Sequence, residues 1–210
     1  MPVVALELYL VYVVVAFGVR TFAHYRRTGS TGFKGVARGS GAAARIGALL
    51  FVVAIALGLL APVLDLAGVV RRVAMLDSFA LRAVGTSLYV AGFVTTIIAQ
   101  SQMGVSWRIG VDPAERTDLV TTGIFQFVRN PIFAAMLLVA GGLALLDPTP
   151  VAIVAVTCLL LASQIQVRLV EEPYLIDRHG RPYREYAARA GRFVPGAGLL
   201  SAVGRSRSEV

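Results

Sequence analysis

Five long runs of apolar residues restrict what this sequence can fold into more than any other feature. The runs cover about residues 3–19, 46–64, 79–99, 131–146 and 150–167. A helix that crosses a membrane needs roughly 20 mostly apolar residues. We therefore predict an all-α fold, an integral membrane helical bundle of about five transmembrane helices with a C-terminal cytoplasmic helical segment.

The composition also favours a membrane protein. The 210 residues are 57% hydrophobic and 15% charged, whereas soluble domains are about half apolar and about a quarter charged. The net charge of +8 comes almost wholly from arginine, because Lys34 is the only lysine. The basic residues are scattered between apolar runs, so we expect them to face cytoplasm and membrane lipids rather than nucleic acid.

The charge of the connecting segments predicts an orientation. Residues 20–45 hold six basic residues and no acid, and eight arginines follow Val167. The turn at 147–150 has no basic residue. Arginine-rich segments tend to stay in the cytoplasm, so both basic segments should lie inside and the N-terminus outside. The 20–45 segment is rich in glycine and serine, and we expect a flexible linker rather than a substrate gate.

The tripeptide Arg129-Asn130-Pro131 stands before the fourth apolar run. Proline suits the first position of a helix, and the Asn130 side chain can cap that helix. The helix N-terminus and Arg129 would together make an anion site. The alternative is that Arg129 only reaches up to lipid phosphate.

Two adjacent carboxylates, Glu171 and Glu172, end the last apolar run. Charged groups at that depth are costly unless they are paired or face an aqueous cavity, so we expect Arg129 as their partner across such a cavity. Adjacent helical residues point about 100° apart, so one glutamate can bind a ligand while the other orients an arginine. The alternative is an interfacial acidic pair that bridges to Arg168 or to the tail arginines.

Two tyrosines, Tyr183 and Tyr186, follow Gly180, which permits a turn with positive φ. Residues three apart share a helix face. The rings would then line an aromatic pocket for a flat or cationic ligand, or they are tyrosines of the membrane interface.

These segments together resemble the superfamily of membrane methyltransferases that includes isoprenylcysteine carboxyl methyltransferase and the phospholipid N-methyltransferases. Its first motif has the form Gly-x-(Tyr/Phe)-x-x-x-Arg-His-Pro-x-(Tyr/Phe)-x-Gly, and residues 123–135 read GIFQFVRNPIFAA. Its second motif is Glu-Glu-x-x-Leu, a glycine, Tyr-x-x-Tyr and Arg-x-x-Pro, and it is matched by Glu171-Glu172-Pro173-Tyr174-Leu175, Gly180, Tyr183-Arg184-Glu185-Tyr186 and Arg192-Phe193-Val194-Pro195. The resemblance covers the chain from Gln100 onward. The sequence departs from the first motif where Asn130 replaces the histidine, Phe133 a tyrosine and Ala135 a glycine.

The resemblance implies S-adenosylmethionine as cofactor. Arg129 or the helix N-terminus would hold its carboxylate, and Glu171 or Glu172 its ammonium. The adenine would lie against the 120–124 segment or under the two tyrosines. The expected cofactor-binding residues are Val120, Thr122, Gly123, Ile124, Arg129, Asn130, Glu171, Glu172, Tyr183 and Tyr186, with Arg129 and Glu172 as the catalytic pair.

The acceptor is expected to be hydrophobic or lipid-linked, since a site at the ends of membrane helices can admit an acyl or prenyl chain sideways. The chain has only His24 and His179 as near-neutral bases, so an acceptor that is already ionised, a carboxylate or a thiolate, is favoured over an amine. An amine or phospholipid acceptor, an NADPH-dependent sterol-type reductase and a non-enzymatic scaffold are the alternatives. We expect no metal and no nucleic acid as partners.

The organisation that follows has three parts. Residues 1–99 should form three transmembrane helices with the basic flexible loop at 20–45. Residues 100–200 should form the methyltransferase core, with a tight helical hairpin at its centre, and residues 201–210 a disordered tail.

Overall fold

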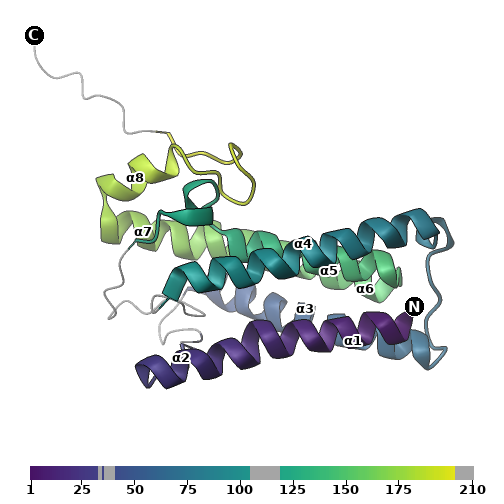
Figure 1. Ribbon diagram of the computed structural model, residues 1–210. Helices are drawn as coiled ribbons and strands as arrows, with labels where there is room; N and C mark the ends of the chain where they lie inside the picture. Colours follow the sequence, from purple (N-terminus) through teal and green to yellow (C-terminus); the bar gives the residue numbers. More distant parts are fainter. Residues whose placement is uncertain (33–34, 36–40, 105–118, 202–210) are drawn as a thin grey trace, which may run out of the picture.

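The computed structural model of the chain describes residues 1–32, 35, 41–104 and 119–201, and it is helical throughout its membrane part (Figure 1). The helices are α1 (Pro2–Val13), α2 (Arg20–Thr28), α3 (Ala42–Leu66), α4 (Phe79–Met103), α5 (Pro131–Leu146), α6 (Pro150–Ile165), α7 (Glu172–His179) and α8 (Arg181–Ala187). Single π-helical turns, Val14–Val19 and Gln166–Glu171, join α1 to α2 and α6 to α7.

The predicted all-α membrane bundle is confirmed. Four continuous helices are long and apolar enough to cross a membrane, namely Pro2–Thr28, Ala42–Leu66, Phe79–Met103 and Pro150–His179. The predicted fourth span, α5, has only 16 residues, which is about 24 Å of helix. Since α5 packs against both α4 and α6, protein covers much of this shorter helix.

The structure corrects the expected loop at 20–45. Its first nine residues form α2, so the first helix runs on from Pro2 to Thr28. Basic side chains are compatible with a helix, so the helix continues through them. It ends at Gly29, whose φ of 71° closes the last turn. Residues 33–34 and 36–40 of this segment and residues 202–210 of the expected tail lie outside the described part of the chain.

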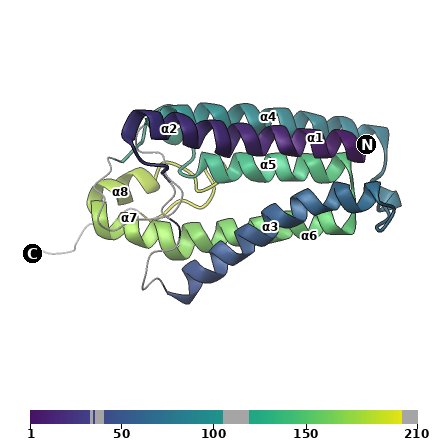
Figure 2. The same ribbon diagram turned by 90° about the horizontal axis from the view of Figure 1, so that it is seen from below.

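The bundle has two closely packed antiparallel pairs, α4 with α5 and α3 with α6. Seen from below, α1, α4 and α5 form one group, and α3 and α6 lie beside it (Figure 2). Small residues bring α4 and α5 together: a Cβ on Gly142 would lie 2.6 Å from the Gly85 carbonyl oxygen, and one on Gly92 would lie 2.6 Å from that of Ala135. Gly142 therefore serves helix packing.

A line of hydrogen bonds joins α1 and its extension to α4. Tyr12 pairs with Thr96 at 3.1 Å, Gln100 donates to the Ala16 carbonyl at 2.9 Å, and Arg20 donates to the Gly104 carbonyl at 2.6 Å. All three pairs are 84 residues apart in sequence, so the two helices run parallel and in register. The Gln100 amide caps a carbonyl inside the π-helical turn of the first span, where regular helical bonding is interrupted.

The predicted tight hairpin between α5 and α6 is also present. Asp147 ends α5, and the Thr149 hydroxyl accepts a hydrogen bond from the Ala152 N–H at 3.1 Å at the start of α6. This turn lies at the end of the bundle opposite α7 and α8 (Figure 1).

Candidate functional site

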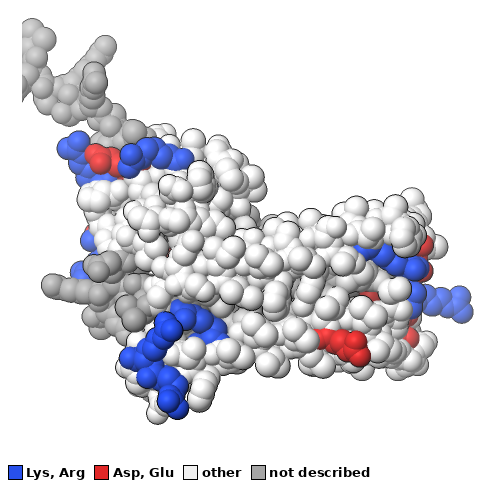
Figure 3. Space-filling model, viewed as in Figure 1, with Lys and Arg blue, Asp and Glu red and all other residues white. Residues whose placement is uncertain are grey.

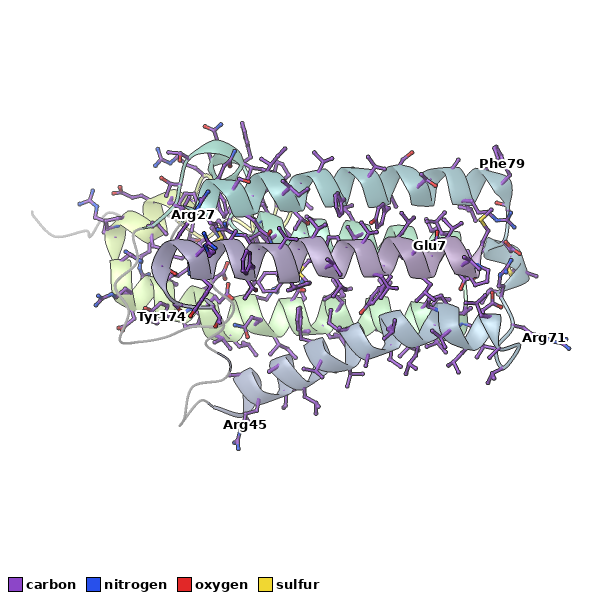
Figure 4. The ribbon with its side chains drawn as sticks, turned by 60° about the horizontal axis from the view of Figure 1, so that its bottom comes forward. Glu7, Arg27, Arg45, Arg71, Phe79 and Tyr174 are labelled. Atoms are coloured by element: carbon purple, nitrogen blue, oxygen red, sulfur yellow. The ribbon has the colours of Figure 1, made fainter. Side chains whose placement is uncertain are left out.

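Both motifs lie at the end of the bundle where α7 and α8 are found (Figure 1). The short helical turn Gly123–Gln126 leads into α5, while α7 continues from α6, and the chain after α8 folds back over both. Arg27 and Tyr174 lie at this end, and Arg71 and Phe79 at the opposite one (Figure 4). Residues that are far apart in sequence therefore meet at one face.

The backbone itself joins the two motifs. Val128 and Gly191 form an isolated parallel β-bridge. The Arg129 N–H donates to the Gly191 carbonyl at 2.7 Å, and the Gly191 N–H donates to the Phe127 carbonyl at 2.9 Å. Gly191 tolerates no side chain, because a Cβ there would lie 1.9 Å from the Val194 carbonyl oxygen. This bridge fixes the chain after α8 against the start of α5.

Three charged side chains, Arg129, Glu172 and Arg192, form a cluster that we call the clasp. Arg129 Nη2 donates to Glu172 Oε1 at 2.7 Å. Arg192 donates to the same carboxylate from the other side, Nε to Oε1 at 2.8 Å and Nη2 to Oε2 at 2.9 Å. The exposed fractions are 2% for the Arg129 side chain, 7% for that of Glu172 and 13% for that of Arg192. The expected convergence of Arg129 and Glu172 is thus observed, as a direct ion pair.

The Arg129 guanidinium also binds the C-terminal segment through backbone oxygens. Nη1 donates to the carbonyls of Ala187, at 2.8 Å, and Ala190, and Nη2 donates to that of Gly198 at 3.0 Å. A buried guanidinium is tolerated only when it is paired and hydrogen bonded in this way. Arg129 therefore holds together α5, α7 and the chain around α8.

Tyr183 and Tyr186 lie in a packed cluster with Ala187 and Ala190, and Tyr183 is only 1% exposed. The Tyr186 hydroxyl donates to the Phe125 carbonyl at 2.7 Å. Burial, and next the charge of Glu172, raise the pKa of Tyr183 to about 12, which places its hydroxyl beside the clasp. The rings face each other edge to face at 6.1 Å, so they form core and not an open aromatic pocket.

Asn130 stands at the N-cap of α5, but its side chain makes no capping hydrogen bond. Its Nδ2 instead donates to the Arg192 carbonyl at 3.1 Å, and its backbone N–H donates to the same oxygen at 3.1 Å. The predicted capping role of the side chain is therefore wrong. Asn130 binds the second motif because the bridged chain lies closer than the first turn of its own helix.

Glu171 points differently from Glu172, as expected for neighbours in a helix. Its side chain is half-buried and accepts a hydrogen bond from Gln166 at 3.2 Å. Burial, next the charge of Glu172 and to a smaller extent that of Glu171 raise the pKa of Tyr183. Of the two, Glu171 keeps the larger accessible surface.

The predicted adenine segment, residues 120–124, lies beside this cluster at the end of α4. Thr122 and Gly123 are exposed, and Gly123 has a φ of 61°. The Gln102 side chain accepts a hydrogen bond from the Ile124 N–H at 2.7 Å. Sequence reasoning assigned no role to Gln102 or Gly191, and it considered a contact of the acidic pair with the tail arginines, such as that of Glu172 with Arg192, only as an alternative.

Comparisons with known proteins agree with this arrangement. A family model described as phospholipid methyltransferase matches residues 80–181. The chain is 27% identical over 123 residues to a protein named Protein-S-isoprenylcysteine O-methyltransferase from Dictyostelium discoideum, a match that covers 58% of this chain and 52% of that protein. The chain thus spans about half the length of this relative. No solved structure matches the chain. Both matches are to methyltransferases, one of the phospholipid and one of the isoprenylcysteine kind, and each covers only part of the chain.

Proposed function

We propose that this protein transfers a methyl group from S-adenosylmethionine to a hydrophobic or lipid-linked acceptor that carries a carboxylate. The observation that carries the proposal is the clasp. Arg129 belongs to the first motif, and Glu172 and Arg192 belong to the second, 43 and 63 positions further along the chain. The three side chains nevertheless bind one another in a single network. This convergence of charged residues from both motifs supports a shared functional site.

The residues beside the clasp fit the zwitterionic end of such a cofactor. Arg192 is the most exposed of the three clasp side chains, at 13%, and we assign it to the cofactor carboxylate. The half-buried Glu171 would accept from the ammonium. Arg129 and Glu172 are already bound to each other, so we assign them a positioning role: they hold Arg192 and the C-terminal segment in place.

The adenine end of the cofactor would lie against the 120–124 turn, where Thr122 and Gly123 are exposed. When bound, the cofactor supplies an activated methyl group on a sulfonium. The protein then has to position the acceptor atom in line with that methyl and exclude water. Tyr183, whose pKa is raised to about 12 by burial and then by Glu172, would stay uncharged at neutral pH and support the site as part of the packed core.

A carboxylate acceptor is favoured because the chain has only two histidines as near-neutral bases and neither belongs to the clasp. Of the two histidines in the chain, His24 is buried on α2 and His179 ends α7. A carboxylate held by two guanidinium groups is a poor proton acceptor, which removes Glu172 from that role. An acceptor that is ionised at neutral pH, a carboxylate or a thiolate, needs no base.

We also propose that the clasp faces the cytoplasm and that Met1 lies outside. Basic side chains gather near α2, and both signs are present near α8 and at the opposite end (Figure 3). At that opposite end Arg72 and Arg82 are paired with Asp65 and Asp77. Residues 20–45 carry six basic residues and no acid, and an excess of basic residues marks the cytoplasmic side. Arg71→Cys and Arg27→Cys variants, treated in intact cells with a thiol reagent that does not cross the membrane, test this orientation. We expect labelling at position 71 and not at position 27, and labelling of position 27 alone would contradict the proposal.

The experiment that tests the function uses the purified protein in nanodiscs, cofactor labelled in its methyl group, and a membrane lipid extract. We expect label in a lipid-soluble product that releases volatile methanol on mild alkaline treatment, as a methyl ester does. Label that survives alkali would instead indicate an N- or S-methyl product and would reject the carboxylate. No labelled product with any extract, together with binding of NADPH, would reject the methyltransferase and favour a reductase.

A further inference from the structure

A second site lies at the end of the bundle opposite the clasp. An apolar cleft of about 670 Å³, a volume that includes its open mouth, runs between α1, α3, α5 and α6. Its walls include Ala54, Gly58, Met136, Ala140 and Leu159. Tyr9 and Tyr12 also line it, but their hydroxyls are bonded to Ile55 and Thr96. The walls therefore offer only apolar surface.

One charged residue, Asp147, belongs to the described lining of this cleft, and it stands at one end. The other lining residues of α5 run from Met136 to Ala144, and the 11 positions from Met136 to Asp147 span about 16 Å of helix. The cleft therefore matches an amphiphilic molecule. It has a long apolar part between the helices and a carboxylate at one end, in the turn between α5 and α6.

The Asp147 carboxylate is buried, at 2% exposed, and neither oxygen has a hydrogen-bond partner among the described residues. Arg72 Nε lies 3.1 Å from Asp147 Oδ1, but its single N–H donates to Asp65 Oδ2 at 2.9 Å. A buried carboxylate oxygen without a donor is costly. A proton shared with Asp65 can serve Asp147 only while one of the two carboxyls is protonated, so when both are ionised Asp147 has room for a donor that the described part of the chain does not supply.

The charged residues around Asp147 do not balance its negative charge. Asp65, Asp77 and Asp147 share Arg72, and Arg82 pairs with Asp77. Three acids thus face two arginines, and the Met1 amino group acts on Asp147 at longer range without an ion pair. Burial, and next Asp65, raise the pKa of Asp147 to about 6. In the described part of the chain no group of His, Cys, Asp and Glu is arranged to hold a metal ion.

We propose that this cleft binds a single-chain amphiphile with a primary ammonium head, the head donating to Asp147 and the alkyl chain lying between α1, α3, α5 and α6. An ammonium supplies both the missing donor and the missing positive charge. The buried end of the cleft excludes a bulky headgroup, since Asp147 is 2% exposed and the Val73 N–H closes over the turn by donating to the Pro148 carbonyl at 2.7 Å. This proposal is independent of the methyltransferase function.

Equilibrium dialysis of dodecylamine and dodecanol against the whole protein in phosphatidylcholine nanodiscs, with empty nanodiscs subtracted, tests the site. We expect one saturable amine site at pH 8, at least about tenfold tighter than that for the alcohol. Because a proton on Asp147 competes with the ammonium, amine affinity should fall about tenfold from pH 8 to pH 5. Equal binding of the two compounds would overturn the proposal and leave a groove for lipid tails.

Three variants make the assignment specific. Asp147→Asn should abolish the preference for the amine and keep alcohol binding, whereas Asp77→Asn, a cluster residue that does not line the cleft, should keep the preference. Ala140→Leu should weaken both compounds by filling the cleft. A preference for the amine that persists in Asp147→Asn would overturn the proposal. It would also be overturned if phosphatidylethanolamine, which has two chains and a larger head, displaced dodecylamine with the same affinity as dodecylamine itself.

Discussion

Arg192 and Glu172 form a two-point ion pair in which Nε and Nη2 lie 2.8 and 2.9 Å from the two carboxylate oxygens. The bond to Glu172 raises the pKa of the Arg192 guanidinium further. The same carboxylate binds Arg129, so one acid is shared by two cations. This shared carboxylate is the centre of the clasp and connects α7 to both motifs.

The two-point geometry predicts that Arg192→Lys is not conservative. A lysine ammonium cannot reproduce two parallel N–H bonds, so we expect a loss of about 1–3 kcal/mol in the free energy of unfolding and a loss of methyl transfer. Arg189→Lys, at an exposed position of the same segment, is the matched control. Denaturant unfolding in detergent measures both, and equal stability of the two variants would count against the clasp.

Removing the shared acid should cost more than removing one arginine. Glu172→Gln leaves two guanidinium groups, one of them buried, without their carboxylate, and we expect about 3–5 kcal/mol of destabilisation. Adding Arg192→Gln should restore part of this loss, because one uncompensated charge is removed. A double-mutant cycle gives the coupling, and strict additivity of the two losses would show that the groups act separately.

The α4–α5 contact predicts opposite results at neighbouring glycines. A Cβ at Gly142 would lie 2.6 Å from the Gly85 carbonyl, whereas a Cβ at Gly141 would meet nothing within 4 Å. Gly142→Ala should therefore destabilise the bundle by about 1–3 kcal/mol, and Gly141→Ala should be neutral or slightly stabilising. Thermal unfolding of the pair in nanodiscs measures this, and a neutral Gly142→Ala would contradict the close approach.

The raised pKa of Asp147 predicts how stability depends on pH. The folded state favours the protonated carboxyl, with a pKa of about 6 against the model value of 3.8. Folding is therefore penalised progressively as pH rises from about 4 to about 6, and the penalty is constant above that. Asp147→Asn removes it, so relative to the wild type this variant should gain about 1–2 kcal/mol between pH 4 and pH 7.5. A parallel pH dependence of both proteins would contradict this.

The sequence predicted the membrane helices well, because long apolar runs have few alternatives. It missed the extension of the first helix to Thr28, since charge composition marks the membrane edge and not the helix end. It predicted that Arg129 meets the acidic pair, because charges at that depth need a partner. Its alternative, a bridge from the acidic pair to the tail arginines, matches the contact of Glu172 with Arg192. It could not predict the need for Gly191, because this depends on how the chain after α8 returns across the site.

The assignment of Glu171 was also beyond the sequence. Two adjacent acids look alike in a linear pattern, and only the helix direction shows that Glu172 is enclosed by arginines while Glu171 stays half-buried beside Gln166. This difference in burial is the reason that we propose Glu172 as a positioning acid and Glu171 as the acid that contacts the cofactor.

Equilibrium binding of S-adenosylmethionine to the purified protein in nanodiscs tests the central claim most directly. We predict saturable binding that Glu171→Gln weakens at least about tenfold while its unfolding free energy stays within about 0.5 kcal/mol of wild type, and no binding of NADPH. Absence of saturable cofactor binding by the folded protein, or full affinity in Glu171→Gln, would contradict the account.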